Sequence, residues 1–265
     1  MRLADIGDNI RLHYADHGDA QAPALVFANA LGTDFRIWDA LLPHLPEGLR
    51  IIRYDMRGHG LSSCPNGPYF MGDLVADAGA LLDTLKVKEC VFVGLSVGGM
   101  VAQGLAAERL DLVRGLVLSN TASKIGTSQI WQDRIAQIRT GGIEAIAFGT
   151  MLKWFSNRYR KEQPEAVEGW MNMLMRSPFE GYLGVASAIG ETDLYESTAR
   201  LSLPTLGIGG SEDGSTPPDL VRETVELIKG AQFELMRGVG HLPAIEKPLE
   251  YATLLTGFLR QIGHI

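Results

Sequence analysis

The chain has 265 residues, with 24 Lys and Arg against 31 Asp and Glu, so its formal net charge is −7. This acidic balance argues against nucleic acids and anionic membranes as partners, because both are bound by cationic faces. Apolar residues make up 46% of the chain and charged residues 21%, which is typical of a globular protein that buries its core without disulfides or metal ions.

The cysteines and the uncharged segments indicate a soluble, cytoplasmic protein. Cys64 and Cys90 are too few for a disulfide framework and lack metal-ligand spacing. The first residues, MRLADIGDNIR, carry regularly spaced charges, and no apolar signal-peptide segment follows them. The longest uncharged stretch, Cys90–Ala107, contains glycines, a serine and a glutamine, and it fits a strand that turns into a helix better than a membrane span.

Short apolar blocks recur along the chain and predict the strands of a mostly parallel sheet. The blocks do not alternate with polar residues, which is typical of strands buried on both faces. Ile10–Asp16 does alternate, so it predicts an antiparallel edge strand, and Gln232–Met236 predicts a late strand. The blocks are Ala24–Ala28, Arg50–Tyr54, Val91–Gly94, Gly115–Ser119 and Pro204–Gly209.

Segments with helical apolar spacing separate these blocks. Alternating strands and helices indicate an α/β fold with right-handed crossovers. The expected helices are Phe35–Leu45, Met71–Leu85, Val97–Leu110, Pro217–Lys229 and Leu249–Gln261.

The alternation breaks between Lys124 and Leu201, where no strand block occurs. Helices are expected there over Gln129–Thr140, over Ile143–Phe155 and after Pro164. A further helix start is predicted at Ser177-Pro178-Phe179-Glu180, with the serine as N-cap and the proline in the first helical position. We therefore predict a core of residues 1–123 and 202–265 and a helical cap of residues 124–201.

A serine motif joins a predicted strand to a predicted helix. Gly94-Leu95-Ser96-Val97-Gly98 fits G-x-S-x-G, in which a sharp turn exposes the serine hydroxyl. The two glycines keep side chains away from Ser96. The Val97 amide lies at the helix start, where unpaired N–H groups and the helix dipole favour an oxyanion.

A serine nucleophile needs a base, and the base needs an orienting acid. His241 is the expected base, because it follows a late strand in Gly238-Val239-Gly240-His241. Asp213 is the expected acid, with Glu212 as its nearest rival, whereas Asn120 carries no charge for that role. The order Ser96, Asp213, His241 matches the nucleophile-elbow enzymes.

The sequence resembles the α/β-hydrolase superfamily over essentially its whole length. This resemblance implies an eight-stranded, mostly parallel sheet with a helical cap inserted after the sixth strand. It also implies that Asp55, Arg57, Gly58 and Gly60 are mainly architectural, so His59 is expected to have a structural role. The matching segments are Tyr54–Ser62, Gly94–Gly99, Gly209–Asp213 with Thr216-Pro217-Pro218, and Gly240-His241.

Within the superfamily the chain is most similar to 3-oxoadipate enol-lactonases. Most relatives have a histidine–glycine pair where this chain has Asn29-Ala30, a departure that it shares with these lactonases. By position, the resemblance implies the Leu31 amide as a second oxyanion donor opposite Val97; Asn29 is either a substrate contact or a turn residue. The matching segments are Asn29–Asp34, Gly94–Gly99, Asn120-Thr121-Ala122, Ile130-Trp131, Arg139–Gly142, Trp154-Phe155, Gly181-Tyr182 and Ala186–Asp193.

The implied reaction is hydrolysis of a small lactone or ester through an acyl-enzyme on Ser96, without a metal ion or an organic cofactor. The enol-lactone carries a carboxylate, which needs a cation or several donors in the pocket. Lys124 and Trp131 are the candidates, each with a surface or packing role as the alternative, and Arg134 is compatible with a solvent-facing position. Trp154 is expected in the cap core or lining the pocket. The oligomeric state stays open, a homo-oligomer included.

Several rival functions share this fold. Another carboxylesterase or lactonase, and a cofactor-free haloperoxidase or perhydrolase, would use the same three residues. A carbon–carbon bond hydrolase often has asparagine before the serine and tryptophan after the histidine, where this chain has Leu95 and Leu242. A ligand-binding protein without activity is the remote option, and an unreactive serine would distinguish it.

Overall fold

The structure is a computed structural model that describes residues 1–265, and its centre is one eight-stranded sheet. The strand order is β1-β2-β4-β3-β5-β6-β7-β8. β1 and β2 pair antiparallel with their neighbours, and the remaining strands are parallel to one another. The strands are β1 (Arg2–Asp5), β2 (Arg11–His17), β3 (Ala24–Ala28), β4 (Arg50–Tyr54), β5 (Cys90–Leu95), β6 (Val113–Ser119), β7 (Thr205–Gly210) and β8 (Gln232–Met236).

The apolar blocks predicted the central strands correctly, because β3 and β5 are buried along their whole length. The prediction of an edge strand at Ile10–Asp16 was wrong in its position. That segment forms β2, which lies between β1 and β4. The edge strand on this side of the sheet is β1, which has only Ala4 buried, so it carries no apolar pattern that sequence analysis could detect.

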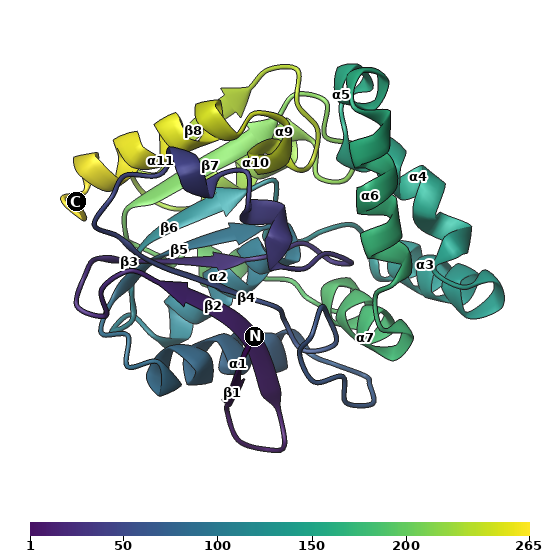
Figure 1. The fold of residues 1–265 in the computed structure, drawn as a ribbon, viewed down its shortest axis with the longest axis horizontal. Helices are drawn as coiled ribbons and strands as arrows, with labels where there is room; N and C mark the ends of the chain where they lie inside the picture. Colours follow the sequence, from purple (N-terminus) through teal and green to yellow (C-terminus); the bar gives the residue numbers. More distant parts are fainter.

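The core helices cover both faces of the sheet, and Figure 1 shows α1 and α11 on opposite sides of it. The predicted helix Phe35–Leu45 is instead two short 3₁₀ turns, η1 (Phe35–Trp38) and η2 (Leu42–His44). Pro43 explains the break, because proline lacks the N–H of a continuous α-helix and clashes with the preceding turn. The core helices are α1 (Met71–Thr84), α2 (Val97–Glu108), α9 (Pro218–Glu226), α10 (Pro243–Glu246) and α11 (Pro248–Gln261).

Six helices lie between β6 and β7 in the chain, and Figure 1 shows α3–α7 gathered on one side of the molecule. The helix expected over Gln129–Thr140 is α3, and Gly142 ends it with a φ of 72°, a conformation that glycine adopts readily. The predicted Ser177 cap was wrong: Pro178 occupies the N-cap position of α7, without a side-chain cap. The division into core and cap stays a prediction. The helices are α3 (Ser128–Gly141), α4 (Glu144–Trp154), α5 (Asn157–Glu162), α6 (Pro164–Met175), α7 (Phe179–Gly190) and α8 (Tyr195–Thr198).

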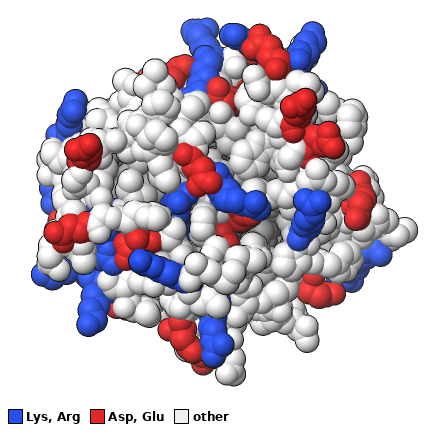
Figure 2. All heavy atoms as spheres, in the orientation of Figure 1, with Lys and Arg blue, Asp and Glu red and all other residues white.

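Charged side chains of both signs are interspersed on the face drawn in Figure 2, and no large area of one sign appears there. A nucleic-acid interface would need a continuous basic area, which this face does not offer. None of the helices combines the length and the apolar character needed to cross a bilayer.

Candidate active site

Four polar residues of interest follow four neighbouring strands. Ser96 comes directly after β5, Asn120 after β6, Asp213 shortly after β7, and His241 in the loop after β8. These strands are parallel and adjacent, so their carboxyl ends meet at one edge of the sheet. Open α/β sheets build their ligand sites at this edge.

The serine turn is strained in the way that its motif predicts. Ser96 has φ 59° and ψ −121°, outside the regions that side chains prefer, and it is the N-cap of α2. A Cβ atom at Gly94 would lie 2.2 Å from the Gly98 carbonyl oxygen, and one at Gly98 would lie 2.4 Å from that of Ala28. Only glycine therefore permits the close approach of strand and helix that raises Ser96 above the sheet.

Asp213 and His241 form a buried, hydrogen-bonded pair. Nδ1 of His241 lies 2.8 Å from Oδ2 of Asp213, and the carboxylate is sealed from solvent. Asn120 and the Thr216 hydroxyl also donate to Oδ2, each at 2.8 Å. The Ser215 and Thr216 amides donate to Oδ1 at 2.7 and 3.0 Å. Since Nδ1 carries the donated proton, Nε2 of His241 is left as an acceptor.

This environment keeps Asp213 ionised. Burial raises the pKa of its carboxyl, but the charge of His241 and the hydrogen bonds from His241, Asn120 and the Ser215 amide outweigh burial, so the pKa lies below its usual value. The rival acid, Glu212, points elsewhere: its carboxylate accepts the Asn157 amide at 3.0 Å. Asp213, and not Glu212, is therefore the carboxylate that contacts His241.

The Ser96 hydroxyl and Nε2 of His241 are both open to the site. Neither makes a hydrogen bond within the protein, and neither is among the sealed unpaired polar atoms, which are Arg53 Nε and the hydroxyls of Tyr54 and Tyr251. Their residues are 8% and 2% exposed. Serine–histidine hydrogen bonds are often long in unliganded enzymes and tighten when a substrate binds.

Two backbone amides face the site without partners. The amides of Leu31 and Val97 donate to no acceptor in the protein. Val97 is the first residue of α2, so the helix dipole adds to the positive potential of its N–H group. The turn is tied to the segment after β3 by the Gly98 amide, which donates to the Asn29 carbonyl at 3.1 Å.

Asn29 holds the fold together and does not face a substrate, so the prediction of a substrate contact was wrong. Its side chain donates to the Tyr54 carbonyl at 2.8 Å and accepts from the Trp38 indole at 2.8 Å. The residue is completely buried. With its amide donor and acceptor both engaged, Asn29 fixes the start of the segment 29–34, which we call the β3 loop.

Lys124, predicted as a carboxylate ligand, already has a carboxylate partner within the protein. Its ammonium group pairs with Asp193 at 3.0 Å, and both side chains are about half exposed, at 52% and 51%. Trp131 does not offer its indole N–H either, because that group donates to the Ile125 carbonyl at 2.6 Å. Its ring is half-buried against Gly190 and packs near Arg134.

Arg134 is a second cation in this helical region, and its partners are neutral. Its guanidinium donates to the Tyr182 hydroxyl at 2.7 and 3.0 Å and to the Thr150 hydroxyl at 3.0 Å. It forms no ion pair with any carboxylate, and it lies over the rings of Trp131 and Tyr182 at 6.0 and 5.8 Å. Sequence analysis could not recognise this site, because Tyr182 is 48 residues away in the chain.

Trp154 lies where the helical segment meets the candidate base. It is buried, and its carbonyl accepts the His241 amide at 2.8 Å. The indole N–H has no acceptor in the protein and is not sealed from solvent, so it remains open for a ligand. Thus Trp154 supports the His241 loop through its backbone, and its indole N–H has no partner in the protein.

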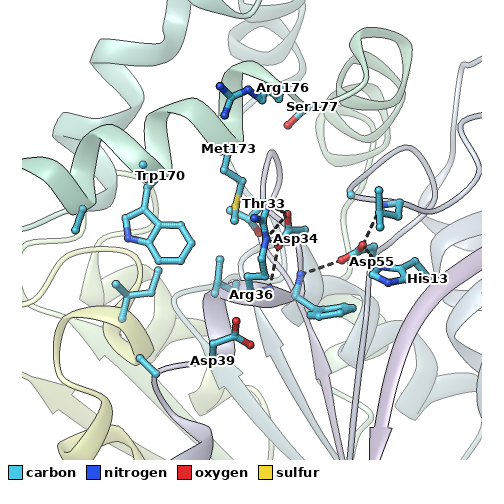
Figure 3. A pocket seen from close by; sticks show the side chains of 18 residues that line it. His13, Thr33, Asp34, Arg36, Asp39, Asp55, Trp170, Met173, Arg176 and Ser177 are labelled. Carbon is cyan, nitrogen blue, oxygen red and sulfur yellow. Dashed lines mark hydrogen bonds and ion pairs between the residues drawn. The ribbon is translucent and has the colours of Figure 1, made fainter. Parts of the chain in front are cut away.

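A separate cleft is not lined by the candidate catalytic residues. It has a volume of about 870 Å³ and is lined by the η1 region together with α6 residues such as Trp170 and Met173. Figure 3 shows these two side chains projecting from one wall, opposite Asp34 and Arg36. Ser96, Asp213 and His241 are absent from the lining, so this cleft is distinct from the serine site.

Two residues of the site were missed as contributors by sequence analysis. Asn120 was considered only as an acid, yet its amide bridges Asp213 and the Gly240 carbonyl, at 2.8 and 3.2 Å. Its φ of 45°, tolerated by asparagine, gives it this direction. Thr216 donates to Asp213 as described above. No group of three or more His, Cys, Asp or Glu side chains is arranged to hold a metal ion.

Comparison with known proteins agrees with this architecture. The alpha/beta hydrolase fold family matches residues 23–142. The 3-oxoadipate enol-lactonase 2 of Acinetobacter baylyi is 35% identical over 240 residues, which cover 91% of this chain and 90% of that protein. The crystal structure of the enol-lactonase from Burkholderia xenovorans LB400 is 32% identical, has a TM-score of 0.93, and covers 98% of this chain and 100% of that one.

A more distant relative differs in its described activity. A thermophilic esterase from Thermogutta terrifontis is 28% identical, with a TM-score of 0.88, covering 96% of this chain and 94% of its own. The sheet order, the serine turn and the whole-length similarity together show that the chain belongs to the α/β-hydrolase family.

Proposed function

We propose that this protein is a serine hydrolase that opens 3-oxoadipate enol-lactone to 3-oxoadipate, with Ser96, Asp213 and His241 as its catalytic residues. The observation that carries the chemistry is the strained Ser96 turn beside the Asp213–His241 hydrogen bond of 2.8 Å. The choice of substrate is supported by the two enol-lactonases described above.

In the first step, Ser96 Oγ attacks the lactone carbonyl carbon while Nε2 of His241 takes the hydroxyl proton. Asp213 holds the imidazole in the productive tautomer and stabilises the imidazolium that forms. The carbonyl oxygen becomes negatively charged and accepts hydrogen bonds from the Leu31 and Val97 amides. Both amides are free of other partners, so they lose no existing bond when the oxyanion forms.

Collapse of the tetrahedral intermediate breaks the bond between the carbonyl carbon and the ring oxygen. The departing enolate takes up the proton from His241 and becomes a ketone. Because the substrate is a ring, the ketone stays attached to the acyl group on Ser96. Water, deprotonated by His241, then hydrolyses the ester and releases the whole product at once.

We assign recognition of the substrate carboxylate to Arg134 in place of Lys124. The guanidinium has neutral partners only, so it can accept a carboxylate without displacing an existing ion pair. Tyr182 links it to the site: a Cβ at Gly32, next to Leu31, would lie 2.9 Å from the Tyr182 ring. Burial raises the pKa of the Tyr182 hydroxyl, and it remains a neutral partner of the cation.

The direct test is turnover of the enol-lactone, followed by the loss of its ultraviolet absorbance, in the wild-type protein and in Ser96→Ala. We expect turnover by the wild type only, and labelling of Ser96 by a fluorophosphonate that the lactone prevents. Labelling with hydrolysis of neutral esters but not of the lactone would identify a general carboxylesterase. Absence of labelling would contradict a nucleophilic serine and favour a binding protein.

A further inference from the structure

The β3 loop carries the Leu31 amide. Hydrogen bonds between its own residues, and one to His59, hold this loop. On one side, the buried residues Thr33 and Asp34 line the 870 Å³ cleft (Figure 3). On the other side, Gly32 contacts Leu174 and Tyr182: a Cβ at Gly32 would lie 2.5 Å from Leu174 Cδ1. Hydrogen bonds fix the direction of the loop's peptide groups.

The peptide that contains the Leu31 N–H is oriented by Thr33. The Ala30 carbonyl accepts from the Thr33 amide at 3.2 Å and from the Thr33 hydroxyl at 2.8 Å. The peptide between Ala30 and Leu31 is trans, so its N–H points opposite to its C=O. By holding the carbonyl, Thr33 directs the Leu31 N–H away from itself, and that N–H has no partner in the protein.

The next peptide is oriented by His59. The Gly32 amide donates to Nε2 of His59 at 2.9 Å, and the imidazole is completely buried. Nδ1 lies 3.4 Å from the Arg57 carbonyl, so the ring proton is on that nitrogen. Burial lowers the pKa of His59 to about 4, so the ring is a neutral acceptor at pH 7.

We propose that His59 and Thr33 are positioning residues that hold the Leu31 amide in the direction required to bind the oxyanion. This inference rests on the proposed function, because it concerns the same serine chemistry. The sequence predicts a structural role for His59, and the inference adds an effect of His59 on kcat. An oxyanion donor acts only if it is aimed in advance, since reorienting a peptide during the reaction costs the energy that the donor supplies.

The first test compares His59→Leu with His59→Gln. Leucine removes the acceptor of the Gly32 amide, whereas glutamine offers its side-chain oxygen in its place. We expect kcat to fall about 10- to 100-fold in His59→Leu, with little change in KM. This loss is smaller than the ~100- to 1000-fold loss for removal of a whole oxyanion donor. In His59→Gln, kcat should recover in part. Thr33→Val, which keeps the side-chain shape and the backbone bond, should lower kcat about 10-fold.

His264→Leu is the matched control. His264 is also buried, and Nε2 bonds the Ala24 carbonyl at 3.0 Å, but at the opposite end of β3 from the loop. We expect His264→Leu to lower the melting temperature without changing kcat. If His59→Leu behaves like His264→Leu, and Thr33→Val keeps kcat within about twofold of the wild type, the inference is wrong.

A binding measurement separates positioning from stability. A boronic acid forms a tetrahedral adduct on Ser96 and requires the oxyanion donors, whereas the reaction product does not. In His59→Leu the affinity for the boronic acid should fall in parallel with kcat, while product affinity stays unchanged; an equal loss of both would contradict the inference. If the wild type neither turns over lactone nor reacts with a fluorophosphonate, the proposed function is wrong. The ¹⁵N chemical shifts of the His59 ring would still test the hydrogen bond from the Gly32 amide.

Discussion

The carboxyl edge of the sheet and the helices between β6 and β7 surround their charged groups with different kinds of partner. At the sheet edge, Asp213 accepts five hydrogen bonds and has a histidine beside it. In the cap, Arg134 has two hydroxyl groups around it and no carboxylate. The first arrangement is complete within the protein, whereas the second has no ionic partner within the protein.

This difference suits two separate tasks, acceleration of the reaction and selection of the substrate. A group that must act on the transition state is best held rigidly by its surroundings, as the strand ends hold Asp213 and His241. A charge that selects a substrate is most useful when its counter-charge is supplied by that substrate. Variants of the two regions should therefore differ in which kinetic constant they change.

Ser96→Ala should have the largest effect, since it removes the nucleophile. We expect kcat to fall at least about 10⁴-fold, with the oxyanion donors and binding leaving a residual rate. The melting temperature should change little, because the hydroxyl makes no hydrogen bond in the protein. Normal turnover in this variant would show that Ser96 is not the nucleophile.

Asp213→Asn should lower kcat about 10⁴-fold, because the amide no longer holds His241 in the productive tautomer. Glu212→Gln is the control, since Glu212 contacts the Asn157 amide and not His241. We expect the control to remain near the wild-type rate in the same lactone assay. Equal losses in the two variants would remove the distinction between these neighbouring carboxylates.

Acid should lower the stability of the whole protein, because His59 is buried in its neutral form. Unfolded His59 titrates near 6.5, whereas burial lowers its folded pKa to about 4. Between these values the unfolded state binds more protons, so the free energy of unfolding falls as pH falls, by up to about 3 kcal/mol. Denaturant unfolding from pH 7 to 4 should show this slope, and His59→Leu should flatten it; an unchanged slope would mean that His59 is not neutral in the fold.

Arg134→Met should raise KM for the carboxylated lactone about 10- to 100-fold, the loss expected for charge-assisted hydrogen bonds. Hydrolysis of a neutral ester should be nearly unchanged, because such a substrate has no charge to bind. A similar loss for both substrates would show that Arg134 supports the cap and does not select the carboxylate.

Lys124→Ala should have the smallest effect on either substrate. Its ion pair with Asp193 is exposed, and such pairs contribute about 0–1 kcal/mol to stability. Steady-state kinetics with both substrates would check this. A KM increase confined to the carboxylated lactone would restore Lys124 as the carboxylate ligand and contradict the comparison drawn above.

Sequence analysis succeeded where the signal is local and failed where a partner is distant. Ser96, Asp213 and His241 could be located because each follows a strand, and neighbouring parallel strands bring their ends together. The partners of Asn29 are a strand carbonyl and a tryptophan in η1, which no local pattern shows. Likewise, the hydrogen bond between Gly32 and His59 joins residues 27 positions apart.

The junction between α4 and α5 is bound to both loops that carry the candidate acid and base. Lys153 and Trp154 accept the amides of Gly214 and His241, at 3.1 and 2.8 Å. Ser156 donates through its amide and hydroxyl to Glu246, which also accepts the Gly240 amide. A chimera that exchanges residues 124–201 for the equivalent insertion of a relative would remove these contacts. The new insertion would therefore have to form equivalent hydrogen bonds to both loops to keep His241 in place.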